Sequence, residues 1–325
     1  MTAAAAPPSR AGVAETALGA ALLLILVAYV CTWFHQQIEW RTGTAVPAAW
    51  WLGGKAAGTL GTPLFFAAGG WYLGRRRPAV MGWYVLSALA CAALLWRFGP
   101  VYGLSPIRDL PEFVSAALLP SPGLAPVYAL GVFPLIAAAG RRLPTWTVLG
   151  IIAGAVVAAD LLPAPAVGTV LTYLLFFLAG QRLGTVLGSL SARASLCRFL
   201  LYATGLAVVA TAAGTAGDWT RPLVELAALP GAVTGAALLA ERPLAERGLS
   251  HVTRGAAVIA ATMTPAVALA GAVLVKRLSS LGGTAQTVVA VVDPLVLTAG
   301  VVTAGLLVSR LLSRMMTPAP LRVTQ

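Results

Sequence analysis

Long unbroken runs of apolar residues constrain the fold of this chain more than any other feature. Ala17–Trp33 contains no charged residue, and Ala285–Ser309 contains only Asp293. A helix needs roughly 17–25 apolar residues to cross a bilayer. A transmembrane β-barrel would instead show segments of about ten residues in which apolar and polar positions alternate. The chain is therefore predicted to be an all-α membrane helix bundle.

Composition supports the same class. The 325 residues are 59% hydrophobic and only 10% charged, and a soluble domain needs more charge to cover its surface. The net charge of +12 is spread in short clusters between apolar segments, which is not the basic stripe of a nucleic-acid-binding protein. The three cysteines match no metal-binding or redox spacing, so we expect neither a metal nor a nucleic-acid partner.

The apolar segments predict about ten transmembrane helices between two short tails. The tails are residues 1–16, which we expect to be disordered, and residues 315–325; the membrane domain is 17–314. The predicted helices are 17–34, 56–74, 79–96, 123–139, 146–162, 166–181, 199–214, 222–240, 255–275 and 285–309.

The distribution of basic residues gives this arrangement a direction. With ten spans, the side that holds both termini carries 15 Lys and Arg residues, whereas the other side carries 7. Loops that remain in the cytoplasm are enriched in Lys and Arg. We therefore expect both termini in the cytoplasm of a multi-pass cell-membrane protein, with the bacterial cytoplasmic membrane and its lipids as the surroundings.

His35 and Glu39 are the candidate catalytic pair. They lie four residues apart where the first helix reaches the outer face, so a continuing helix would place them on one side. Glu39 would then orient the imidazole, and His35 would act as a general base on a hydroxyl group. The alternative is an interfacial His and Glu that face water.

Asp293-Pro294 is a second candidate, because ionisable residues at membrane depth are costly. The pair marks either a broken helix that exposes backbone groups for binding or a simple proline kink. In the second case Asp293 pairs with a neighbouring helix.

Two arginine clusters are candidates for binding an anionic cofactor such as coenzyme A, because guanidinium groups suit phosphates. They are Arg75-Arg76-Arg77 and Arg141-Arg142. The alternative is that they only set topology and attract anionic lipids.

Three segments resemble helices of the membrane acyltransferase-3 family. Thr62–Gly74 is similar to its "VPLFFxxSGYLLG" helix, Leu171–Gly184 to its "YxxFFLLGxxLG" helix, and Ala125–Leu130 more weakly to its "HLWYLxxL" helix. The ten-helix layout with both ends inside also agrees with that family. The family's Arg early in the first helix has no equivalent in 14–21, and its His falls on His35 or on Tyr29 by another alignment.

The resemblance implies transfer of an acyl group from an acyl-CoA donor to a hydroxyl of a glycan or small molecule outside the cytoplasm. This hypothesis predicts a water-filled tunnel onto which His35 opens. A second hypothesis is a catalytically degenerate member that binds or transports a lipid or hydrophobic molecule, and it predicts an apolar cavity open to lipid without an imidazole. A third is an ion-coupled transporter that uses Asp293.

Overall fold

The computed structural model describes residues 9–41, 45–73, 85–90, 111, 125–161, 165–214 and 220–316. Every regular element in these ranges is a helix, and the described residues contain no strand, as the sequence predicts. The predicted helix 79–96 lies mostly outside them, apart from a helical piece at 85–90. The tails 1–8 and 317–325 also lie outside the described residues.

The described helices occur in the following order along the chain. They are α1 (Arg10–Tyr29), the π-helical turn η1 (Val30–Phe34), the 3-10 turn η2 (His35–Gln37), α2 (Ala45–Leu73), α5 (Ala125–Ala139), η3 (Gly140–Arg142), α6 (Thr145–Leu161), α7 (Pro165–Arg182), α8 (Gly184–Ala192), α9 (Leu196–Gly214), α10 (Arg221–Ala240), α11 (Pro243–Arg254), α12 (Ala256–Ser279) and α13 (Gly283–Met316).

Four of the described helical segments are long and apolar enough to cross a membrane: Ala11–Gln37, Pro222–Ala240, Ala256–Ser279 and Gly283–Leu312. A fifth candidate is the pair α7 and α8, which is bent by 73°. The helices predicted at 56–74 and 123–139 are present as α2 and α5 but are not among these candidates. A helical membrane protein accounts for these spans.

Several helices begin earlier than predicted. α1 begins at Arg10, where the Ser9 hydroxyl accepts a hydrogen bond of 3.1 Å from the Gly12 amide; a side-chain cap of this kind satisfies an otherwise free helical N–H. α2 begins at Ala45 rather than 56, so much of the connection predicted between the first two helices is itself helical.

α2 and α7 cross at very short range through two glycines. A Cβ on Gly70 of α2 would overlap the Phe177 backbone oxygen, and one on Gly180 of α7 would overlap the Ala67 oxygen. Only a residue without a side chain lets two helix backbones approach this closely, a common device in membrane proteins. The crossing joins the two segments that carry the strongest family resemblance.

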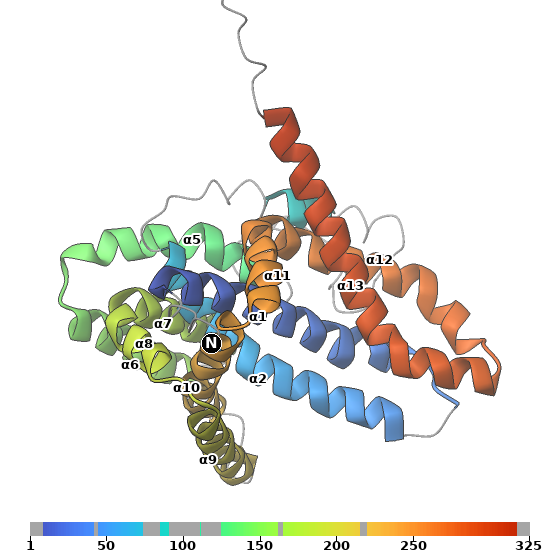
Figure 1. Cartoon of the computed structure of the whole chain (residues 1–325), viewed down its shortest axis with the longest axis horizontal. Helices are drawn as coiled ribbons and strands as arrows, with labels where there is room; N and C mark the ends of the chain where they lie inside the picture. The colour runs from blue at the N-terminus through green and yellow to red at the C-terminus, as the bar shows by residue number, and fades with distance from the viewer. Residues whose placement is uncertain are drawn as a thin grey trace, which may run out of the picture.

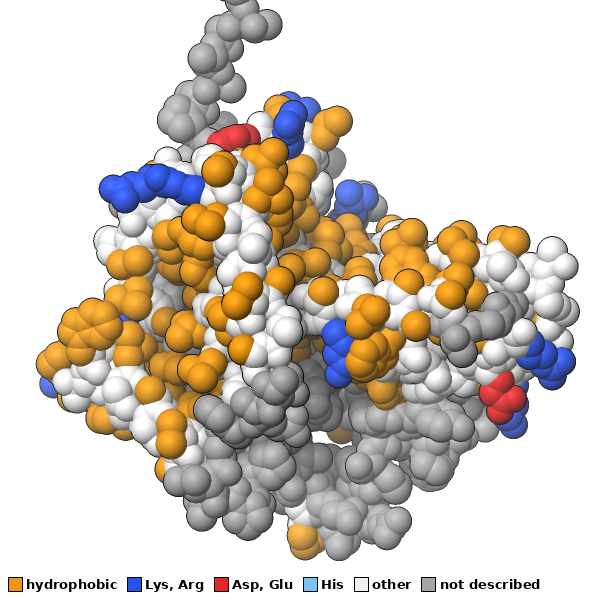
Figure 2. Space-filling view, turned by 90° about the horizontal axis from the view of Figure 1, so that it is seen from below, with side chains coloured by type: hydrophobic (Ala, Val, Ile, Leu, Met, Phe, Trp, Pro, Cys, Tyr) orange, Lys and Arg blue, Asp and Glu red, His pale blue; other side chains and the backbone are white. Residues whose placement is uncertain are grey.

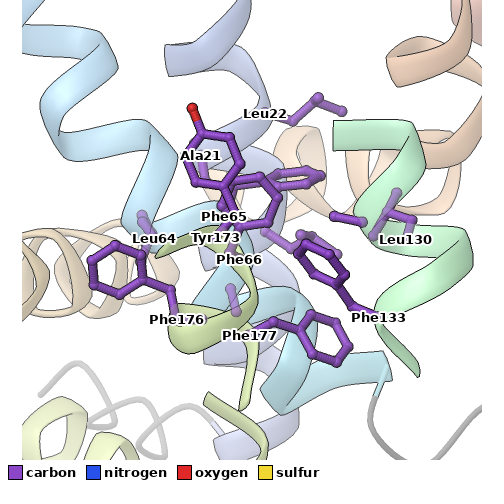
Figure 3. Packing of buried hydrophobic residues seen from close by; sticks show 14 of the residues in the cluster. Ala21, Leu22, Leu64, Phe65, Phe66, Leu130, Phe133, Tyr173, Phe176 and Phe177 are labelled. Carbon is purple, nitrogen blue, oxygen red and sulfur yellow. The ribbon is translucent and has the colours of Figure 1, made fainter. Parts of the chain in front are cut away.

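Aromatic side chains from α2, α5 and α7 surround this crossing (Figure 3). The Phe66 and Tyr173 rings stack with centroids 4.3 Å apart, and Phe133 meets Phe177 edge-on at 5.7 Å. Such pairs add specific geometry to the apolar burial. Ala21 and Leu22 of α1 complete the cluster. All three segments that resemble the acyltransferase family therefore meet in one core.

The remaining helices flank this core. α9 and α10 lie side by side at one edge, and α12 and α13 lie side by side at another (Figure 1). Hydrophobic side chains cover much of the face in Figure 2, whereas Lys and Arg form a few small groups. Large apolar residues such as Leu201 and Val296 are well exposed. Such a surface suits lipid contact.

α11 is an amphipathic helix where the sequence reading expected only a basic loop. Ala245, Leu249 and Val252 lie on one side by helical spacing, and Arg247 and Arg254 lie on the other. The helix packs against α1, and the Thr253 hydroxyl donates a 2.6 Å hydrogen bond to the Glu15 carbonyl. This arrangement is typical of a helix that lies at a membrane surface.

Candidate functional site

His35 is fully buried at the point where α1 ends. The helix widens into the π-helical turn η1 and then tightens into η2, after which Ile38 is extended. Because the helix stops before Glu39, His35 and Glu39 do not share a helix face, and Glu39 is exposed. The predicted geometry of this pair is therefore wrong, although π-helical turns are themselves frequent at functional sites.

Asp293 takes the position next to the imidazole that the sequence assigned to Glu39. The His35 Nδ1 atom lies 2.8 Å from Asp293 Oδ2, and the two side chains are 0% and 8% exposed. α13 runs unbroken through Pro294, so the broken helix is not seen and Asp293 pairs with a neighbouring element. When Nδ1 carries the proton it donates to the carboxylate, which leaves Nε2 as an acceptor.

Two buried acceptors in η2 lack partners within the described ranges: His35 Nε2 and Gln37 Oε1. Buried polar atoms are nearly always hydrogen-bonded, so exceptions point to a functional role or an absent ligand. The His35 side chain has no exposed surface. The predicted opening of His35 onto a water-filled tunnel is therefore not present in this conformation.

Trp40 covers the imidazole. Its ring centroid lies 4.6 Å from that of His35, and its Nε1 donates a 2.9 Å hydrogen bond to the His35 carbonyl. Apolar side chains from α1, η1, α12 and α13, including Phe34, Met263 and Val301, form the neighbouring cluster. The charge-bearing pair is thus enclosed by apolar groups, where each electrostatic contact is stronger than in water.

Gln286 holds the segment that follows His35 in place through hydrogen bonds. The sequence did not predict this residue as part of the site. Its buried side chain accepts a 2.8 Å hydrogen bond from the Arg41 amide and donates a 2.8 Å bond to the Glu39 carbonyl. Ser279 Oγ accepts a 3.1 Å bond from the Glu39 amide. These contacts hold residues 38–41 over the junction of α12 and α13. A polar residue at the edge of the last apolar run was the only signal in the sequence.

The predicted anion-binding arginines lie elsewhere or outside the described residues. Arg141 and Arg142 are exposed in η3, whereas Arg75, Arg76 and Arg77 lie outside the described residues. Arg182, which was not predicted as a site residue, organises this turn by donating to the Leu143 carbonyl at 2.9 Å and the Gly140 carbonyl at 2.5 Å.

The arginine turn follows α5, whereas His35 lies beyond the C-terminal end of α1. The core that contains α5 and α7 includes Leu18 and Leu22 of α1, whereas His35 follows its far end. The 20 residues of α1 span about 30 Å, close to the thickness of the hydrocarbon layer. Among the described residues, no group of three or more His, Cys, Asp or Glu side chains could hold a metal ion.

Two apolar grooves follow α1 between these ends. The first groove, of about 540 Å³, lies between α1, α2, α9 and α10, and reaches Glu241 and Arg242. The second groove, of about 590 Å³, lies between α1, α11 and α13. Ala20, Leu24 and Leu239 line both grooves, and neither lining includes an imidazole.

Comparison with known proteins adds no relative. No family model matches this chain, and neither a curated protein nor a solved structure matches it significantly.

Proposed function

We propose that this protein is a membrane-embedded O-acyltransferase in which His35 is the general base and Asp293 is its positioning residue. The observation that carries the proposal is the buried 2.8 Å contact between His35 Nδ1 and Asp293 Oδ2, with Nε2 left without a described partner. A carboxylate on one ring nitrogen fixes the tautomer that lets the other nitrogen accept a proton.

The proposed reaction uses an acyl-CoA as donor substrate and a hydroxyl of a glycan or small molecule as acceptor. The hydroxyl gives its proton to His35 Nε2 while its oxygen attacks the thioester carbonyl carbon. The carbon–sulfur bond then breaks, and the coenzyme A thiolate takes the proton from Nε2.

Donor binding is proposed at the basic end of the bundle. The exposed Arg141 and Arg142 belong to this end, together with Arg75, Arg76 and Arg77 by the sequence pattern. Arginine binds phosphate oxygens through paired N–H groups. The acyl group would then have to reach His35, which lies beyond the C-terminal end of α1.

The membrane topology that accompanies this reaction has ten spans with both termini in the cytoplasm of a bacterial cell. The 15 to 7 asymmetry of Lys and Arg supports it. The three segments similar to the acyltransferase-3 family support the same architecture by meeting in one core.

A second candidate function is favoured by a different observation. The two grooves are apolar and lack an imidazole, and His35 is closed off. These features fit a catalytically degenerate member of this architecture that binds or transports a lipid or hydrophobic molecule.

An assay of coenzyme A release in proteoliposomes distinguishes the acyltransferase from the lipid-binding function. Purified protein is supplied with acetyl-CoA or succinyl-CoA on one side and candidate glycans on the other, and free thiol and acylated product are measured. We expect His35→Ala to lower turnover by about 100-fold or more, and Asp293→Asn to lower kcat with little change in KM. Glu39→Gln is the matched control and should retain activity. Unchanged turnover in His35→Ala would overturn the assignment.

A further inference from the structure

The two grooves on α1 form one divided site rather than two separate depressions. Leu239 projects between them, lines both, and is 42% exposed. Ala20 and Leu24 form their shared floor on α1. A ridge with an apolar channel on either side fits a ligand with two apolar chains better than one with a single chain.

The second groove is lined by apolar residues alone. α11 contributes Ala245, Gly248, Leu249 and Val252, and α13 contributes Val302. Because α11 is amphipathic and packs on α1, its apolar side roofs this groove while its charged side faces outward. A helix of this kind lies at the boundary between the acyl chains and the headgroups of a bilayer.

The first groove ends at two opposite charges. Glu241 and Arg242 both belong to its lining and both are exposed at the turn between α10 and α11. Within the part of the chain that the structure describes, neither side chain forms an ion pair. A carboxylate and a guanidinium on consecutive residues of one apolar groove are complementary to a zwitterion that carries a phosphate and an ammonium group.

We propose that this divided groove binds one two-chain phospholipid with an ethanolamine headgroup. One acyl chain lies in each groove on either side of Leu239, Arg242 binds the phosphate, and Glu241 accepts hydrogen bonds from the primary ammonium. The proposal is independent of acyl transfer, since it needs neither acyl-CoA nor His35.

The charged pair accounts for headgroup selectivity. A choline headgroup carries the same phosphate but has no N–H to donate, so it satisfies Arg242 but leaves Glu241 without a hydrogen bond. A glycerol headgroup lacks the cation altogether. Burial of the acyl chains contributes the same affinity for every headgroup. This contribution grows with the number of methylene groups that the grooves bury.

Native mass spectrometry of the delipidated full chain tests the proposal. The protein is titrated in detergent with phosphatidylethanolamine, phosphatidylcholine or phosphatidylglycerol, all with the same acyl chains. We expect one phosphatidylethanolamine per chain, bound about fivefold more tightly than either of the others. Equal binding of all three lipids would overturn the proposal.

Three variants divide the site into its parts. Glu241→Gln should remove the preference for ethanolamine over choline, while Arg242→Gln should weaken both lipids by about fivefold. Leu239→Trp should fill the grooves and weaken all lipids by about tenfold. Leu239 is partly exposed, so the change spares the core, and an unchanged unfolding midpoint verifies this.

Matched controls carry the same substitutions at sites outside the lining. Leu201→Trp changes a leucine of α9 that is 68% exposed, and Glu39→Gln changes an exposed carboxylate elsewhere; both should bind lipid as the wild type does. The proposal fails if Leu239→Trp binds phosphatidylethanolamine as tightly as Leu201→Trp, or if the ethanolamine preference survives in Glu241→Gln.

Discussion

Two regions of this molecule are equally buried but are held together in opposite ways. The aromatic core around Phe66, Phe133 and Phe177 is assembled by shape, with Gly70 and Gly180 bringing two helix backbones into contact. The cluster around His35 is held by hydrogen bonds that involve Asp293, Trp40 and Gln286. The first region consists of packed apolar side chains. The second contains two buried hydrogen-bond acceptors without described partners.

This difference separates what maintains the fold from what performs chemistry. Apolar packing between helices gains stability from close contact alone. A histidine and a carboxylate inside an apolar cluster cost desolvation energy, which their mutual contact only partly returns. Stability alone would therefore favour apolar residues at His35 and Asp293, and their presence points to a function.

The largest effect should come from closing the glycine crossing. Gly70→Ala and Gly180→Ala each force α2 and α7 apart, since the new methyl group meets backbone rather than a movable side chain. We expect a loss of about 3 kcal/mol in each variant. Thermal or denaturant unfolding in a fixed detergent measures it.

Gly150→Ala is the matched control, because a Cβ on this glycine of α6 would meet nothing within 4 Å. Alanine favours the helical state there, so this variant should be as stable as the wild type or slightly more stable. Similar losses at Gly70 and Gly150 would show that the crossing does not limit packing.

The next largest effect should come from removing the carboxylate next to His35. Asp293→Ala leaves the buried imidazole without its Nδ1 partner, and we expect a loss of about 2 kcal/mol. Asp293→Asn retains an acceptor oxygen and should lose about half as much. Equal stability of Asp293→Ala and the wild type would contradict the pairing, and denaturant midpoints measured at one pH decide it.

The sequence predicted the core far better than the polar cluster, for a physical reason. Apolar length places α10 and the start of α13 within two residues, because burying a helix in lipid requires that length. The contact of His35 with Asp293 joins residues 258 positions apart, and no local pattern encodes it. The prediction that Glu39 is the partner of His35 was wrong because the α-helix gives way to a π-helical turn at Val30–Phe34 and ends before Glu39.

Amphipathic α11 was missed for a different reason. Its residues are too polar for a membrane span, and a reading based on apolar length assigns such a segment to a loop. The spacing of Ala245, Leu249 and Val252 at one side of a helix was nevertheless present in the sequence. A search for periodicity rather than total hydropathy would have found it.

A smaller effect should come from releasing the segment that covers the imidazole. Gln286→Ala removes the hydrogen bonds to the Glu39 carbonyl and from the Arg41 amide, and we expect a loss of about 1 kcal/mol. Hydrogen exchange at the Arg41 amide should accelerate while exchange in α7 stays constant, because the opening is local.

Gln36→Ala is the control for this release. Gln36 is exposed and makes only long contacts, of 3.4 Å to the Cys31 carbonyl and 3.3 Å to the Pro47 carbonyl. Exchange at Arg41 should therefore remain unchanged in this variant. If both variants accelerate exchange equally, Gln286 is not the residue that holds this segment in place.

The smallest effect should come from Glu39, and it sharpens the comparison most. Because its side chain is exposed and only its backbone joins the cluster, Glu39→Gln should change the unfolding free energy by less than about 0.5 kcal/mol. A large loss would mean that a carboxylate at the surface, and not Asp293, supports the imidazole. Denaturant midpoints of Glu39→Gln and Asp293→Asn measured together separate the two carboxylates, because each change replaces one charge by an amide of the same shape. The buried position should respond and the exposed one should not.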